Sequence, residues 1–67
     1  MRNNSLTKQE LIVLNFVAEG KTNPEIAKEL TVETGTAKAH VHSIISKFGG
    51  KNRTQAAVLG FKLGLVK

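Results

Sequence analysis

Apolar residues recur along the chain at spacings of three and four residues, and nowhere do they alternate with polar residues over the length of a strand. This periodicity is typical of amphipathic helices that bury one face. It predicts four helices and no strands, over about residues 7–20, 22–30, 34–48 and 53–64. We therefore expect an all-α domain of four helices.

Short capping motifs mark where these helices begin. Thr7–Glu10 and Thr22–Glu25 both have the capping-box form, in which Glu follows Thr by three residues. Pro24 falls in the first turn of the second helix, where its missing N–H costs nothing. Gly49-Gly50 ends the third helix, and Asn52–Gln55 is a further capping signal that opens the fourth.

The third helix has two different faces. Only residues 31–33 separate it from the second helix, which is the length of a helix-turn-helix joint. At about 100° per residue, one stripe should face the core, formed by Ala37, Val41, Ile44, Ile45 and Phe48. The opposite arc is small and polar, formed by Gly35, Ala39, His42, Ser43 and Ser46. No acid occurs between residues 34 and 48, so this arc could enter a DNA major groove without repelling phosphates.

The charge of the chain is divided between its halves. Residues 1–33 carry four Lys or Arg and five Glu, whereas residues 34–67 carry six Lys or Arg and no acid. The formal charge is therefore −1 in the first part and +6 in the second. An ordinary solvated helix face mixes both signs, whereas clustered cations attract a phosphate backbone through counterion release. The distribution favours DNA contact by the third helix over a plain surface role.

The composition argues against several other functions. The chain has no cysteine, three Phe and neither Trp nor Tyr, which argues against disulfides, thiolate metal sites and an aromatic platform for single-stranded bases. Its longest apolar runs have four residues, far short of a membrane span. His40 and His42 are two residues apart on a helix and cannot share a metal ion. Since no nucleophile has a neighbouring base, we predict that the domain is not an enzyme. We also expect it to use no cofactor or metal.

Four short motifs follow one another along the chain. They are L-T-x-x-E at Leu6–Glu10, G-x-T-N-x-E-I-A-x-x-L at Gly20–Leu30, T-x-K-x-H-V at Thr36–Val41 and N-R-T-Q-A at Asn52–Ala56. In this order and spacing they resemble the LuxR-type (GerE-like) helix-turn-helix domain of bacterial transcription factors. The resemblance covers residues 6–66. It implies a tetrahelical domain whose third helix lies in the DNA major groove and whose fourth helix forms a homodimer.

The resemblance also implies roles for individual residues. It implies base contacts by Lys38, Ala39 and His42. It implies contacts with the DNA backbone by Thr22, Asn23, Thr36, Lys47 and Arg53. Some alternatives stay open: Lys38 could donate to guanine or to phosphate, His40 could be a structural residue, and Arg53 could instead brace the fourth helix.

Glu33 departs from the family pattern. In the family, a Ser or Thr at this position usually caps the third helix, which is the recognition helix. Glu is a poor N-cap, although its charge suits the helix dipole. We expect Thr34 to take over the cap.

The fourth helix is apolar nearly all round, which a surface helix of a small monomer should not be. One face should meet the core, with Ala56, Leu59, Gly60 and Leu63. The other face is predicted to form a dimer interface, with Ala57, Val58, Phe61 and Leu65. We expect a weak homodimer in which Gly60 and Ala57 permit close approach of the two helices. Burial inside a larger parent protein is the alternative explanation.

These observations predict sequence-specific binding of double-stranded DNA for transcriptional regulation, on an inverted-repeat operator and with RNA polymerase as a further partner. The competing interpretations are a protein-interaction adaptor of the transcription machinery and a sigma-factor-like promoter-contacting domain. Residues 1–5 are expected to form a disordered leader and residues 6–67 the domain. That domain is either free-standing or the output domain of a larger regulator such as a response regulator. The resemblance implies a cytoplasmic protein at the bacterial nucleoid, with no membrane association.

Overall fold

The computed structural model describes residues 6–66. Its helices are α1 (Lys8–Ala18), α2 (Asn23–Leu30), α3 (Thr34–Phe48) and α4 (Arg53–Lys62). No strand occurs between residues 6 and 66. The predicted all-α class and the four helices are therefore confirmed, whereas the predicted disordered leader, residues 1–5, lies outside the described residues.

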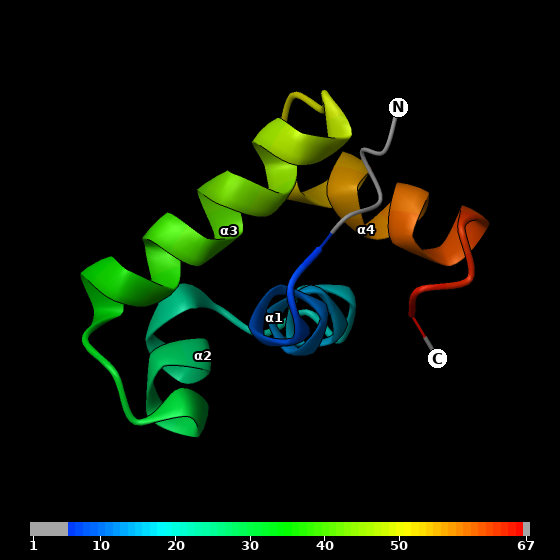
Figure 1. Cartoon of the computed structure of the whole chain (residues 1–67). Helices are drawn as coiled ribbons and strands as arrows, with labels where there is room; N and C mark the ends of the chain where they lie inside the picture. The colour runs from blue at the N-terminus through cyan, green and yellow to red at the C-terminus, as the bar shows by residue number, and fades with distance from the viewer. Residues whose placement is uncertain (1–5, 67) are drawn as a thin grey trace.

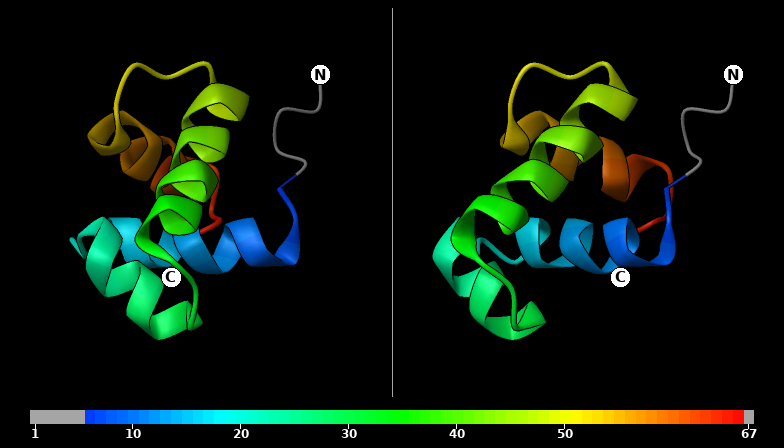
Figure 2. Two further views of the ribbon diagram at one scale, coloured as in Figure 1. Left: turned by 90° about the vertical axis from the view of Figure 1, so that its left-hand side faces the viewer. Right: turned by 60° about the vertical axis from the view of Figure 1, so that its left-hand side comes forward.

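The helix α3 packs against each of the other three helices. Figure 1 looks nearly along the axis of α1, with α3 passing across it, α4 on the far side from α2, and α2 beneath the start of α3. The turned views show α3 crossing α1 (Figure 2). The helix α1 packs against both α3 and α4, while α2 packs mainly against α3. The helix α3 is thus supported by α1, α2 and α4, and its remaining side faces outward.

The core is small and is formed by one face of each helix. Its buried apolar residues are Val13, Leu14, Val17, Ile26, Ala27, Ala37, Val41, Ile44 and Ala56. The stripe expected on α3 is confirmed, because Ala37, Val41 and Ile44 are buried. Ile45 and Phe48 complete the stripe, half-buried against the edge of the core.

Three of the four helices begin with the side-chain caps that the sequence predicts. The hydroxyl Oγ1 of Thr7 accepts from the N–H of Glu10 at 3.1 Å, and the carboxylate of Glu10 accepts from the N–H of Thr7 at 3.0 Å. Thr22 and Glu25 make the same reciprocal pair, and the N–H of Gln55 donates to the side chain of Asn52.

The helix α3 begins differently. Its N-cap is Glu33, whose side chain makes no capping hydrogen bond. The expectation that Thr34 takes over is wrong, because Thr34 is already the first helical residue. The recognition helix proposed from the sequence therefore starts without a side-chain cap.

The turn between α2 and α3 is sharp because Thr31 adopts left-handed backbone angles, φ 59° and ψ 47°. The N–H of Val32 then donates to the carbonyl of Ala27 at 3.0 Å, and the Val32 side chain packs against the core. A left-handed residue followed by a hydrophobic contact is a common way to end a helix. The chain changes direction within residues 31–33, as the spacing predicts.

The fourth helix is shorter than predicted, which overturns two assignments. It ends at Lys62, and Gly64 has φ 74°, which turns the chain back toward the domain. The N–H of Leu65 donates to the carbonyl of Gly60 at 2.9 Å, and its side chain packs against the core. Leu63, expected in the core, is instead 51% exposed. Helical angles do not apply beyond Lys62, so placing Leu65 on an exposed face of α4 was wrong.

Gly60 permits α4 to lie close against Leu14 of α1 and against Val66. It is buried, and a Cβ atom there would lie 2.8 Å from Cγ2 of Val66 and 3.0 Å from Cδ2 of Leu14. Both distances are shorter than the optimal separation of two carbon atoms, about 3.5–4.0 Å. The expectation that Gly60 lets a second copy approach is therefore wrong, because residues of the same chain already cover it.

Gly60 and Gly35 should respond in opposite ways to replacement by alanine. Gly60→Ala places a methyl group against the fully buried Leu14, and we expect overpacking to outweigh the better helix propensity of alanine. The free energy of unfolding should fall by about 1 kcal/mol. Gly35 is exposed in α3 with open space around the added atom, so Gly35→Ala should raise it by about 0.5–1 kcal/mol. Urea unfolding measures both, and a gain in stability for Gly60→Ala would refute the close approach.

Candidate nucleic-acid interface

The predicted base-contacting residues share the outward side of α3. Lys38, Ala39 and His42 are all exposed, while their neighbours Ala37 and Val41 are buried. The helix carries no acid along its whole length, Thr34–Phe48. The fold therefore presents a small, polar and cationic surface of the kind that a major groove admits.

The predicted backbone-contacting residues lie at the ends of three helices. Thr22 and Asn23 stand at the start of α2, Thr36 in the first turn of α3, Lys47 in its last turn, and Arg53 at the start of α4. The structure brings Asn23 and Arg53 into direct contact. It draws Lys47 toward α1 instead, and Thr22 uses its hydroxyl as the α2 cap while remaining exposed.

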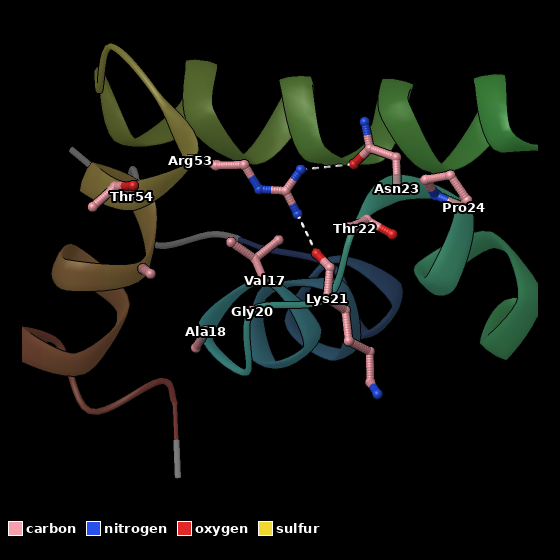
Figure 3. Close-up of a pocket in the computed structure, with 10 residues that line it drawn as sticks. Val17, Ala18, Gly20, Lys21, Thr22, Asn23, Pro24, Arg53 and Thr54 are labelled. Atoms are coloured by element: carbon pink, nitrogen blue, oxygen red, sulfur yellow. Dashed lines mark hydrogen bonds between the residues drawn. The ribbon is translucent and has the colours of Figure 1, made fainter.

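Arg53 joins α4 to the connection between α1 and α2. Its Nη1 donates to Oδ1 of Asn23 at 2.9 Å, and its Nη2 donates to the carbonyl oxygen of Lys21 at 2.6 Å (Figure 3). Residue 53 is about thirty positions later in the chain than either acceptor, so these bonds fix the start of α4 against a distant segment. The alternative in which Arg53 braces the fourth helix is confirmed.

An open pocket of about 550 Å³ lies beside this guanidinium, between the α1–α2 connection and the first turns of α4. Figure 3 shows the Arg53 side chain reaching across it toward Asn23 and Lys21. Its walls are both polar and apolar, formed by Val17, Ala18, Gly20, Lys21, Thr22, Asn23, Pro24, Arg53, Thr54 and Ala57. The pocket therefore adjoins three of the residues assigned to the DNA backbone.

The carboxylate of Glu10, for which the capping motif predicts only a role at the start of α1, also holds the C-terminal half of α3. Glu10 is 6% exposed, and its two oxygens accept from Oγ of Ser43 and Nζ of Lys47, both at 2.7 Å. A signal for this role is present in the sequence. Glu10 occupies the same helical stripe as Val13, Leu14 and Val17, and an acid on a buried stripe requires partners.

These partners decide the ionisation of Glu10. Burial is the largest single influence and by itself raises its pKa. The hydrogen bonds from Lys47, the Thr7 amide and Ser43, together with the positive charge of Lys47, outweigh burial and lower the pKa to about 2. Glu10 is therefore a carboxylate at neutral pH, and it offsets the charge of Lys47, which is one of the predicted backbone contacts.

Two further observations concern other kinds of site. Between residues 6 and 66, no helix is both long and apolar enough to cross a membrane. The same part of the chain holds no group of three or more His, Asp or Glu arranged to bind a metal ion.

A short helix joined by a three-residue turn to a longer one, whose outward face is cationic and free of acids, defines a helix-turn-helix DNA-binding domain. The chain belongs to the LuxR family of bacterial regulatory proteins, since the family model (GerE) matches residues 4–59. The resemblance noted in the sequence is therefore confirmed.

Several curated bacterial proteins are similar to the chain over most of its length. The transcriptional regulatory protein LiaR of Bacillus subtilis is 50% identical over 92% of the chain, and DesR of the same organism is 39% identical over 96%. The response regulator protein VraR of Staphylococcus aureus is 37% identical over 92%. The chain spans only 29%, 32% and 30% of these relatives, respectively.

Replacing Glu10 by glutamine should destabilise the domain in a pH-dependent manner. Glu10→Gln keeps the size of the side chain but removes the charge that faces Lys47. Because the folded-state pKa of about 2 lies below the ordinary value of 4.5, the stabilisation is fully present above about pH 5 and is lost as pH falls toward 2. The difference in unfolding free energy between the unchanged domain and the variant should shrink by about 3 kcal/mol over that range.

Urea unfolding at a series of pH values from 7 down to 2 measures this difference. Glu29→Gln is the matched control, because Glu29 is exposed on α2 and its replacement should have a small effect. A Glu10→Gln difference that stays constant between pH 7 and pH 3 would show that Glu10 is not held as described.

Proposed function

We propose that this domain binds double-stranded DNA in a sequence-specific manner, with α3 lying in the major groove, as part of a bacterial transcriptional regulator. The observation that carries the proposal is the outward face of α3. It is exposed, acid-free and cationic, and a short helix and a tight turn stand before it. The membership of the LuxR family supports the same function.

Three residues on that face read the bases. The ammonium group of Lys38 donates to guanine O6 or N7, and His42, one turn further along, donates or accepts according to the base edge it meets. The methyl group of Ala39 contacts a thymine methyl. These assignments rest on the exposure of all three side chains and, for Lys38 and Ala39, on their position in the family motif at Thr36–Val41.

The residues assigned to phosphates flank this face at the ends of α2, α3 and α4. Thr22 and Asn23 approach the backbone on one side, and Thr36 lies at the entry to the groove. Lys47 is a weaker electrostatic contributor than its charge alone indicates, because Glu10 holds it at 2.7 Å. Arg53 lies next to Asn23, to which its guanidinium donates a hydrogen bond.

The relatives indicate where such a domain acts. They are transcriptional regulatory proteins and a response regulator, and each is about three times as long as the chain. We infer that the domain is the output module of a regulator of this kind, working at the nucleoid and in contact with RNA polymerase. The family membership argues against the sigma-factor-like alternative.

The exposed face of α4 serves as the dimer contact. Val58 and Phe61 stand one helical turn apart and are 46% and 56% exposed, whereas Ala57 is half-buried against the core. This surface is smaller than the one expected from the sequence, because Leu65 is excluded from it. We propose a weak homodimer that forms on DNA and aligns two copies of α3 with two inverted half-sites. The adaptor interpretation would instead place a partner protein on the same face.

Selection of duplexes from a random DNA pool should enrich an inverted pair of short half-sites. Lys38→Ala should lower affinity for the enriched site by about 1–3 kcal/mol and relax the preference at one base position. Lys28→Ala removes the same charge from an exposed position on α2 and should weaken enriched and random duplexes alike, by much less. If Lys38→Ala weakens both kinds of duplex equally, Lys38 contacts phosphate. If no duplex is enriched and binding is insensitive to salt, the adaptor interpretation replaces DNA binding.

The dimer is tested by placing a charge on the exposed face of α4. Phe61→Glu should abolish the sedimenting dimer at high micromolar concentration and remove cooperative filling of the second half-site. Ile12→Glu is the matched control, because Ile12 is 46% exposed on α1 and gains the same charge without meeting the partner. An unchanged domain that is strictly monomeric at this concentration and binds the inverted repeat one-to-one would contradict the dimer.

A further inference from the structure

The guanidinium of Arg53 determines which way the Asn23 amide faces. A guanidinium has five N–H donors and no acceptor. The atom of Asn23 that lies 2.9 Å from Nη1 must therefore be the carbonyl oxygen Oδ1 and not the amide nitrogen. The second bond of Arg53, to the carbonyl of Lys21, keeps the guanidinium in this position.

With its oxygen engaged, Asn23 turns its NH2 group the other way. Figure 3 shows the amide nitrogen pointing away from Arg53 and out of the pocket, toward the side of α3. Asn23 is half-buried, and between residues 6 and 66 no buried side-chain nitrogen or oxygen lacks a hydrogen-bond partner, so its NH2 group is not buried. Its only side-chain hydrogen bond to other residues of the described chain is the one to Arg53, which leaves the NH2 group available to a ligand.

The orientation decides whether this position attracts or repels DNA. Phosphate oxygens only accept hydrogen bonds, so an outward NH2 group binds them and an outward carbonyl oxygen repels them. The two orientations of an amide have nearly the same shape, and packing alone discriminates poorly between them. A neighbour that can only donate is therefore an effective way to select one.

We propose that Arg53 is a positioning residue for DNA binding: it holds the amide of Asn23 so that its NH2 group faces a backbone phosphate. This inference rests on the DNA binding proposed above and assigns the contact within it. Arg53 then contributes mainly through Asn23, because one N–H of each terminal nitrogen already holds the guanidinium within the domain.

Asn23→Asp keeps the oxygen that accepts from Arg53 and replaces the NH2 group by a second oxygen. The aspartate still accepts from Arg53, now as a charge-assisted bond, and its charge suits the first turn of α2. The melting temperature should therefore stay the same or rise. The outward atom becomes a charged oxygen, so affinity for the selected duplex should fall about tenfold or more.

Asn52→Asp is the matched control. Asn52 is exposed one residue before Arg53, and its Oδ1 caps α4 by accepting from the N–H of Gln55, which an aspartate does equally well. It adds the same charge close by without touching the proposed contact, and should lower affinity by only a few-fold. Equal losses for both variants would reduce the effect of Asn23→Asp to general repulsion and overturn the proposal.

A double-mutant cycle tests the role of Arg53 itself. Arg53→Lys keeps the charge but cannot hold both acceptors with a planar fork, so the amide is released. Asn23→Ala and Arg53→Lys should each weaken DNA binding several-fold, and the double variant should be no weaker than Asn23→Ala alone. Additive losses would mean that Arg53 binds phosphate directly, which would overturn the positioning role.

The two hypotheses fail in distinguishable ways. If the unchanged domain binds no duplex, the proposed function itself is refuted. If the unchanged domain binds and Asn23→Asp binds equally well, DNA binding stands and only the positioning role is lost. A lower melting temperature for Asn23→Asp would also count against the inference, because it would mean that Arg53 does not face an oxygen.

Discussion

One buried carboxylate ties the outward helix to the rest of the domain. Glu10 lies in the first turn of α1, and its oxygens accept from Ser43 and Lys47, which stand one turn apart on α3. Burying a carboxylate without such partners would cost several kcal/mol, so α1 and α3 can pack here only in the register that brings both donors to it. Apolar contacts alone are non-directional and would let a helix on so small a core rotate. The direction in which the outward side of α3 points is therefore set by this contact with α1.

The position of α4 depends on both of its ends. At the start, Arg53 makes two polar bonds to the α1–α2 connection, and near the end Gly60 lies close against Leu14 and Val66. The reversal at Gly64 then folds the last described residues onto the core. What remains exposed on α4 is a short apolar face that includes Val58 and Phe61.

The sequence predicted the parts of the fold that local spacing determines. The helices, the three-residue turn and the capping box at Thr7 follow from residues within one or two turns of each other. The ties made by Glu10 and Arg53 join residues thirty or more positions apart, and local spacing carries no information about such pairs. The end of α4 was misplaced for a related reason. The helical angles that placed Leu65 on the dimer face assumed a helix continuing to Gly64, where the chain in fact reverses.

The backbone conformation of Thr31 makes the domain less stable than it could be. A β-branched residue in the left-handed conformation costs about 1 kcal/mol or more relative to glycine, and the turn persists because Val32 and the flanking helices over-determine it. Glycine or asparagine would adopt these angles with less strain. The domain is thus less stable than its own backbone permits, as expected of a sequence selected only to stay above a stability threshold. The turn is a place where the sequence can drift toward greater stability without moving either of the helices that it joins.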